Sequence, residues 1–502
     1  MALNWPLPSK VLDLFAEFRN KTNGLPVPCG NGLLGALVYH GIDGIDAAEK
    51  QGMRELALRG GPWTASEADL LLEYCESDVR GLSELFFRML PQFDLPRALL
   101  RGKYMGAVAQ MENCGIPIDV NMLAALRNNW DVLKRQLISH VDIYRVYESG
   151  VFKAERWAQL IEALHICWPR LASGRLDLTD DTFRMMAERY PSIVEPYRQL
   201  RFMLSQMRLE ELAIGTDGRN RCLLSAYRSV TGRNQPSNTR FVFGPAVWLR
   251  NLIRPRRGHG IAYIDWSQQE FGIAAYLSGD EAMIAAYESG DPYLAFAKQA
   301  GAVAAHDTKQ TCGPIREQFK SCALGVLFGM GVDSLARRIG QSTAHARELL
   351  DLHRRSFPRF WRWSDAAVDY AELKGSINTV FGWTFHVGER ANPRTIRNFP
   401  MLANGAEMLR LACILGTEQG IRICAPVHDA ILIEAQVDIL ESEAIKTQAA
   451  MANASRYVLG HELRSEVKLF SYPNRFTDKR GDEMWNALCH ILAKTSAAQT
   501  FS

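Results

Sequence analysis

The stretch IDWSQQEFG at residues 264–272 carries one acid after an apolar run and a second acid five residues later. The apolar run Ile261–Ile264 predicts a buried strand, and the spacing of apolar residues from Gln268 onward predicts a helix. Asp265 is therefore expected at the exit of the strand, and Glu270 one turn into the helix. Because aspartate is common at strand ends and turns, Asp265 alone indicates no function.

A second acid lies at the tip of a predicted hairpin. The stretch IRICAPVHDAILIEA (421–435) contains two apolar runs that meet at His428 and Asp429. Two aspartates on adjacent strand ends can hold two divalent cations about 4 Å apart, which activates an attacking hydroxyl and neutralises a leaving phosphate. Asp265 and Asp429 are therefore a candidate catalytic pair.

The region 201–260 is rich in arginine. It contains eleven arginines, no lysine and three acids, a net charge of +8, whereas the whole chain carries only +3. Such a concentration suits contacts with nucleic-acid phosphates. A solvated charged surface has the same composition, so that alternative stays open.

Length and composition exclude several classes of protein. With 502 residues, 47% hydrophobic and 23% charged, the chain is an ordinary globular protein with room for two to four domains. Ten cysteines without a C-x-x-C pair argue against a zinc ribbon and favour buried, reduced thiols in a cytosolic protein. We see neither a signal peptide nor the roughly 18 uninterrupted apolar residues that a membrane span needs.

Five motifs, in the expected order, resemble those of family A DNA polymerases. The stretch 264–280 resembles motif A (D-Y-S-Q-x-E-L-R), REQFKSCALGVLFGMG (316–331) resembles motif B (R-x-x-x-K-x-x-x-F-G-x-x-Y-G), and VHDA (427–430) resembles motif C (V-H-D-E). NCGIPID (113–119) and TGR (231–233) match two further family signatures. The resemblance covers about residues 100–480, and the wording around TGR resembles an atypical branch found in phages and mobile elements.

The resemblance implies a template-directed DNA polymerase that adds deoxynucleotides to a primer 3′-hydroxyl by two-metal phosphoryl transfer. Its implied partners are primer–template DNA and dNTPs, and its cofactor is two Mg²⁺ ions, for which Mn²⁺ can substitute. We expect a monomer without membrane contact in the cytoplasm of a bacterium or of a phage-infected cell. The implied fold is α+β, a right hand of palm, fingers and thumb, with a partial, mostly helical exonuclease-like remnant at the N-terminus.

The same resemblance divides the chain into five expected segments. These are an inactive exonuclease-like segment (1–95), a linker and helical thumb (96–215), a first part of the palm with motif A (216–280), fingers with motif B (281–375), and a second part of the palm with motif C and a C-terminal tail (376–502). Periodicity alone predicts helices near 314–328 and 399–419 and a hairpin at 376–390.

The motifs also imply a role for individual residues. The metal ligands would be Asp265, Asp429 and the carbonyl of Trp266, and Lys320 would be a third catalytic residue. The implied nucleotide-binding residues are Arg316, Lys320, Leu324, Phe328, Glu270 and Gln268. The implied DNA-binding residues are Arg233, Arg394, Asn398, His428, Arg219, Arg221 and Arg228.

For several of these residues a plainer interpretation stays open. Glu270 would block a ribose 2′-hydroxyl, or it is a solvated acid favoured at a helix start. His428 would border the primer end, or it is a turn residue bonded to backbone. The arginines at 219, 221 and 228 would contact phosphates, or they are structural or solvated.

The predicted helix at 314–328 can also be interpreted without the family. Arg316, Lys320, Leu324 and Phe328 recur every four residues and so share one helical face. Two cations followed by two apolar groups suit a triphosphate followed by a sugar and base, since cations neutralise charge in phosphoryl transfer. On spacing alone, an ordinary amphipathic helix is the preferred interpretation, and only the order of the motifs reverses that preference.

The chain departs from the family pattern at four positions. Leu324 stands where Phe or Tyr is usual, Phe328 where Tyr is usual, Ala430 where glutamate follows the motif C aspartate, and Leu402 where glutamine is usual. Both metal ligands are retained, so we expect chemistry to persist while fidelity and sugar selection change. The rival interpretations are a silent DNA-binding relic and a polymerase that prefers RNA templates or ribonucleotides.

The N-terminal segment carries an incomplete second motif set. LLEYCESDVRGL (71–82) resembles the last motif of a 3′–5′ exonuclease, with Tyr74 and Asp78 four residues apart. The first motif of that fold, D-x-E, has no counterpart upstream, as if the chain began midway through the domain. A two-metal site without its first carboxylates should not hydrolyse DNA.

Overall fold

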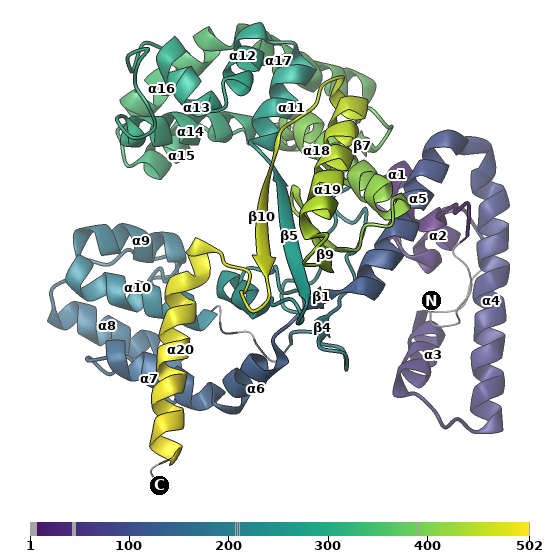
Figure 1. The fold of residues 1–502 in the computed structure, drawn as a ribbon, viewed down its shortest axis with the longest axis horizontal. Coiled ribbons are helices and arrows are strands. Elements are labelled where there is room, and N and C mark those ends of the chain that lie inside the picture. Colours follow the sequence, from purple (N-terminus) through teal and green to yellow (C-terminus); the bar gives the residue numbers. More distant parts are fainter. Residues whose placement is uncertain are drawn as a thin grey trace.

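The computed structural model describes residues 8–42, 47–205, 207, 209, 211–388 and 391–500. Helices dominate this part of the chain and surround one four-stranded antiparallel sheet (Figure 1). Within it, no helix combines the length and the apolar character needed to cross a bilayer.

The sheet is built from strands that are far apart in sequence. Its order is β10-β5-β9-β8, with β5 (His259–Trp266), β8 (Ile423–Val427), β9 (Ala430–Gln436) and β10 (Ser465–Ser471). Along β5, Ile264 and Trp266 are buried while Tyr263 and Asp265 are only half-buried, because successive side chains point to opposite faces. Helices α18 (Pro393–Glu418) and α19 (Leu440–Leu459) pack together, α18 against β8 and α19 against β5 and β9.

An upper helical lobe follows the sheet at the end of β5 (Figure 1). It contains α11 (Gln269–Ser278), α12 (Glu281–Glu288), α13 (Pro292–Gln299), α14 (Gly313–Leu327), α15 (Val332–Ile339), α16 (Thr343–Ser356) and α17 (Pro358–Lys374). Phe296, Phe357 and the fully buried His353 form part of its core. Burial lowers the pKa of His353 to about 3, so its imidazole is neutral and its Nδ1 accepts a hydrogen bond from Trp361 at 3.1 Å.

A lower helical lobe lies across an opening from the upper one (Figure 1). It contains α6 (Val120–Asn128), α7 (Trp130–Val141), α8 (Ala154–Ala163), α9 (Asp180–Arg189), α10 (Pro191–Ser205) and a hairpin of β2 (Tyr147–Glu148) and β3 (Val151–Phe152). The aromatic rings of Trp157, Trp168 and Phe183 pack edge to face and tilted in its core.

The segment after α19 forms a strand and a helix. Strand β10 pairs with β5 along seven residues and forms one edge of the sheet. Helix α20 (Lys479–Thr500) then contacts α7 of the lower lobe and the short helix η2 (Val247–Leu252). Arg250 of η2 pairs with Asp478 just before α20, at 2.7 Å.

The N-terminal segment is helical, as predicted. It contains α1 (Leu14–Thr22), α2 (Leu33–Tyr39), α3 (Ala47–Arg59), α4 (Ala65–Met89), η1 (Leu90–Gln92) and α5 (Leu95–Cys114). Thr64 forms a reciprocal capping box with Glu67 at the start of α4. Leu14, Phe18, Leu37 and Leu85 belong to a small core separate from the main one.

Helix α1 connects this segment to the rest of the molecule through backbone carbonyls. Arg19 donates to the carbonyls of Tyr227 and Arg228, at 3.3 and 2.7 Å. Asn23 donates to the carbonyl of Val230 at 2.7 Å. Its backbone carbonyl also accepts from His386 in the hairpin of β6 (Ser376–Asn378) and β7 (Thr384–His386), which confirms the hairpin predicted there.

A buried ion pair joins α1 to α5, and breaking it should loosen the N-terminal helices. Arg101 and Glu17 form two hydrogen bonds of 2.5 and 2.7 Å, and both side chains are under 10% exposed. Glu17→Ala leaves the guanidinium buried and unpaired, which should cost about 3–5 kcal/mol. Native-state hydrogen exchange of the α1 amides measures this loss.

The matched control is Glu76→Ala, which removes an exposed i,i+4 partner of Arg80 on α4. Exposed pairs of this kind contribute little, so α1 protection should not change. Equal protection of α1 in both variants would contradict the role given to the buried pair.

Candidate active site

The two predicted aspartates lie next to each other at one end of the sheet. Asp265 stands opposite Ala430 in the β5–β9 ladder, and Asp429 belongs to the two-residue turn between β8 and β9. The amide of Trp266 donates to the carbonyl of Asp429 at 3.3 Å, which joins the strand end to the turn. His428 adopts a left-handed conformation (φ 56°), which the tight turn requires and most residues avoid.

The pair is electrostatically strained when no cation is present. Burial raises the pKa of Asp265 well above its usual range, and the charge of Asp429 raises it further. Burial also raises the pKa of Asp429, and a hydrogen bond links the two carboxyl groups. The pair therefore retains a shared proton to higher pH than a solvated aspartate does.

This arrangement fits a divalent cation bound with substrate rather than by protein alone. Asp265 Oδ1 is buried and has no hydrogen-bond partner. Among the described residues, no group of three or more His, Cys, Asp or Glu side chains could enclose a metal ion. Magnesium is commonly held by one or two carboxylates together with substrate phosphates, which is what two aspartates can offer.

Sequence reasoning missed two charged neighbours on β10. Glu466 stands opposite Asp265, and Lys468 opposite Tyr263, in the β5–β10 ladder. Lys468 lowers the pKa of Asp265 and Glu466 raises it, after the larger effects of burial and of Asp429. The alternating pattern SEVKLF could have predicted a strand here, but nothing in it indicates pairing with β5.

A cavity of about 460 Å³ lies beside the turn that carries Asp429. Its lining includes Gly232, Arg233, Arg250, His428 and Arg480, of which Arg250 and Arg480 were not predicted. Burial, followed by the charges of Arg250 and Arg233, lowers the pKa of His428, so the ring is neutral near pH 7. Burial likewise lowers the pKa of Arg233, against which Glu270 and Asp429 act as nearby negative charges.

The backbone of the TGR turn at this cavity accepts a hydrogen bond from a buried arginine of α18. Arg410 of α18 donates to the carbonyl of Gly232 at 2.6 Å and pairs with Glu407 at 2.8 Å. Its guanidinium also lies over the ring of Tyr227, 4.8 Å from the centroid. A buried arginine is tolerated here because the carboxylate of Glu407 balances its charge.

Motif A continues from the sheet into the upper lobe. Gln268 adopts φ 50° at the start of α11, and its Oε1 is buried without a partner. Glu270, in the first turn of α11, is half-buried. Burial raises its pKa and the charge of Asp429 raises it further, which places Glu270 in the electrostatic field of the aspartate pair.

Motif B forms α14, close to the predicted bounds, and packs against α11. Lys320 and Leu324 are partly exposed and Phe328 is 39% exposed at the end of the helix. Arg316 differs, because it is buried and donates to Asp291 at 2.6 Å and to Glu317 at 2.5 Å. A triphosphate would have to displace these carboxylates, so its contact with Arg316 stays a prediction.

The two predicted residues at the start of α18 meet the end of α14. Asn398 donates to the carbonyl of Phe328 at 3.1 Å, while its Oδ1 is buried without a partner. The side chain of Arg394 lies against Gly329, whose φ of 67° suits glycine. Their contact with DNA is not tested by these positions.

The prediction of a phosphate contact at Arg219 is wrong. Its side chain is buried and donates to the carbonyls of Cys114 and Gly115, at 2.5 and 2.8 Å, and to Glu434 at 2.9 Å. Arg221 pairs with Asp217 at 2.6 Å and also donates to the carbonyl of Asn113. Arg228 is exposed, and Arg221 keeps a partly exposed side chain, so of the three only Arg219 is buried.

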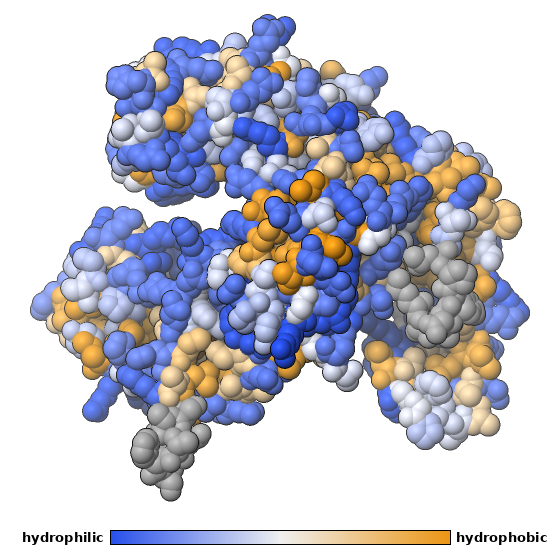
Figure 2. Space-filling view, in the orientation of Figure 1, coloured by the Kyte–Doolittle hydropathy of each residue, from blue (hydrophilic) through white to orange (hydrophobic). Residues whose placement is uncertain are grey.

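A deep opening separates the two helical lobes, and its visible walls are mostly hydrophilic (Figure 2). The sheet lies at the closed end of this opening (Figure 1). The molecule therefore offers a polar opening that is bounded at its closed end by the sheet.

Comparison with known proteins finds one family. The model of DNA polymerase family A matches residues 176–471. DNA polymerase I of Chloroflexus aurantiacus is 27% identical over 438 residues, which are 79% of this chain and 44% of that protein. Thermostable DNA polymerase I of Thermus aquaticus is 24% identical over 440 residues, which are 81% of this chain and 51% of that protein. The chain thus spans about half the length of these curated relatives.

A solved structure shares the fold. The POL domain of Pol1 from M. smegmatis, in complex with DNA primer-template and dNTP, matches with a TM-score of 0.65 at 20% identity. The match covers 91% of this chain and 80% of that chain. It confirms the predicted α+β, right-hand architecture.

Neutralising one aspartate should stabilise the protein when divalent cations are chelated. Asp265→Asn replaces a carboxyl group that has to take up a proton on folding near neutral pH, and the new amide can donate to Asp429, so we expect a gain of about 0.5–2 kcal/mol. Thermal melting in EDTA measures it. Excess Mg²⁺ should raise the melting temperature of the parent chain more than that of the variant.

Asp438→Asn is the control, since Asp438 is exposed after β9. The strain assigned to the pair is refuted if Asp265→Asn melts at or below the parent temperature in EDTA.

Proposed function

Since the chain belongs to DNA polymerase family A, we propose that it is a template-directed DNA polymerase. It extends a primer 3′-hydroxyl with deoxynucleotides, and its partners are primer–template DNA and dNTPs. The observation that carries this proposal is the adjacency of Asp265 and Asp429, which belong to separate motifs and meet at one end of the sheet.

Asp265 and Asp429, with the carbonyl of Trp266, are the groups that would hold two Mg²⁺ ions. When bound, such ions activate the attacking hydroxyl and neutralise the leaving pyrophosphate. The aspartates would give up their shared proton on binding, which removes the strain between them. Lys320, whose side chain is 41% exposed, would add positive charge toward the triphosphate.

The two helical lobes and the sheet would correspond to the three parts of the right hand. The upper lobe would act as fingers, the lower lobe as thumb, and the sheet with α18 and α19 as palm. Primer–template DNA would occupy the hydrophilic opening (Figure 2), with Arg233 and His428 in the cavity beside the primer end. Arg394 and Asn398 would lie near the template where α14 meets α18.

The N-terminal helices would support the polymerase region without hydrolysing DNA. Asp78 pairs with Lys50 at 3.1 Å, and the Lys50 ammonium also lies 5.9 Å from the ring centre of Tyr74. Lys50 neutralises the carboxylate of Asp78 and would compete with a metal ion there. This supports the interpretation of the N-terminal segment as an inactive exonuclease-like remnant.

Removing either aspartate should abolish primer extension. Asp265→Ala and Asp429→Ala each remove a ligand for the divalent ions, so extension of a labelled primer should fall by about 10³ or more. Primer–template affinity should persist, because arginine contacts supply most of it. Gel extension and fluorescence anisotropy measure the two quantities separately.

Asp438→Ala is the matched control and should extend as the parent does. Extension by either aspartate variant at the parent rate would contradict the proposal that Asp265 and Asp429 hold the two metal ions. A parent chain that binds primer–template but never extends it would instead favour the silent relic.

Sugar selection and base selection should depend on different residues. Glu270→Ala removes the carboxylate predicted to oppose a 2′-hydroxyl, so ribonucleotide incorporation should rise by about tenfold or more. Leu324→Phe restores a flat ring beside the sugar, so discrimination against mispaired deoxynucleotides should improve. Single-nucleotide kinetics with matched, mismatched and ribonucleotide substrates measure both effects.

Glu372→Ala, an exposed change on α17, is the control. An unchanged ribonucleotide ratio in Glu270→Ala, or an unchanged mismatch ratio in Leu324→Phe, contradicts the corresponding role.

A further inference from the structure

Two cysteines meet where α5 ends against β8, outside the site described above. Cys114 is the last residue of α5, and Cys424 lies at an irregularity of β8, where the register with β9 shifts between Ile423 and Ala425. Their sulfur atoms are 3.9 Å apart although 310 positions separate them in the chain. A bulged residue leaves the regular ladder, and its side chain is thereby re-aimed.

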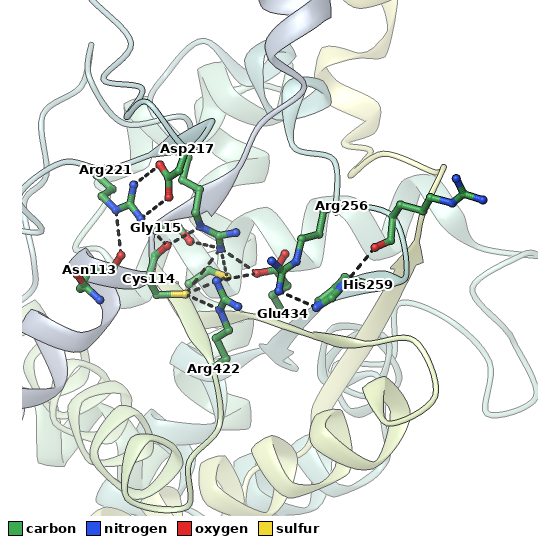
Figure 3. A network of polar contacts seen from close by, with 12 residues as sticks. Asn113, Cys114, Gly115, Asp217, Arg221, Arg256, His259, Arg422 and Glu434 are labelled. Atoms are coloured by element: carbon green, nitrogen blue, oxygen red, sulfur yellow. Dashed lines mark hydrogen bonds and ion pairs between the residues drawn. The ribbon is translucent and has the colours of Figure 1, made fainter. Parts of the chain in front are cut away.

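Two arginines surround the sulfur pair (Figure 3). Arg219 Nη2 lies 3.7 Å from both sulfurs, and Arg422 Nε lies 3.4 Å from Cys114 Sγ. Both guanidinium groups also approach the buried carboxylate of Glu434, at 2.9 and 3.4 Å. The neighbouring Arg221 is already neutralised by Asp217.

Counting charges in this cluster leaves one cation unbalanced. Arg219 and Arg422 contribute two positive charges and Glu434 one negative charge, so a thiolate on Cys114 completes the balance. The hydrogen bond with Cys424, together with Arg422 and Arg219, lowers the pKa of Cys114 to about 6. Its thiol is partly exposed, whereas Cys424 is buried and its pKa is raised by the same hydrogen bond and by burial.

We propose that Cys114 and Cys424 form a peroxide-reactive pair that closes reversibly to a disulfide. The Cys114 thiolate attacks one peroxide oxygen, the O–O bond breaks, and hydroxide leaves while Cys114 becomes a sulfenic acid. The sulfur of Cys424 then attacks the Cys114 sulfur, and the displaced hydroxide takes the Cys424 proton as water. Two electrons pass from the thiols to the peroxide, and small thiols reverse the reaction.

This pair gives the protein an oxidation-dependent link that the polymerase chemistry does not require. The disulfide would join the end of α5 to the strand that leads, five residues later, to Asp429. The sulfurs need to approach from 3.9 Å to about 2 Å, a movement within the reach of side-chain rotation. The inference goes beyond the proposed function, and thiol chemistry tests it without any measurement of DNA synthesis.

The first test is the pH dependence of alkylation of the full chain by iodoacetamide, followed residue by residue by mass spectrometry. The rate at Cys114 should have its midpoint near pH 6, against about 8.5 for a free cysteine thiol in solution. Arg422→Gln, a half-exposed position, should raise the Cys114 midpoint by about one pH unit. A Cys114 midpoint above pH 8 in the parent chain would overturn the proposal.

The second test adds stoichiometric hydrogen peroxide and maps the products. The parent chain should yield one linked peptide pair containing Cys114 and Cys424, which dithiothreitol separates. Cys424→Ala should instead accumulate a sulfenic acid on Cys114 that dimedone traps, while Cys29→Ser should behave as the parent does. Dimedone-labelled Cys114 in the parent chain without the linked pair would overturn the proposal.

Discussion

Two half-buried carboxylates have to be held together against their mutual repulsion, and most of the fold serves that constraint. The register of β5 against β9 brings Asp265 beside the turn that carries Asp429. A slip of one residue would turn Asp265 toward the core, where Ile264 and Trp266 now lie. The long helices α18 and α19 pack against this sheet, so the register is enforced by a large apolar core as well as by strand hydrogen bonds.

Much of the candidate site could be predicted because short, continuous stretches of sequence determine its local structure. The strand, turn and helix around Asp265, the hairpin at Asp429 and α14 all follow from local apolar spacing. Helix α18 shows the limit. We expected its start near residue 399, but it begins at Pro393 and runs through Pro400, where Asn404 donates to the Pro400 carbonyl at 2.7 Å. The spacing of apolar residues gives no signal for a hydrogen bond from a side chain to the backbone.

The arginine-rich region shows a second limit. Composition counts charges but cannot identify their partners, and Arg219 and Arg250 turn out to be paired with the distant acids Glu434 and Asp478. Glu466 was missed for the related reason that its neighbour lies 201 positions away in sequence, at Asp265. Long-range pairing across a sheet is set by the whole fold, and a single sequence contains no local signal for it.

The hydrogen bonds from α1 and its C-cap to the backbone at residues 227–230 have a consequence for protein engineering. The helices that resemble a functionless relic contain the donors that hold the loop leading into the TGR turn. Trimming them would therefore not yield a smaller version of the same fold. It would remove hydrogen-bond donors from the loop that ends at Arg233. The N-terminal helices therefore help to position the loop that leads into the candidate site.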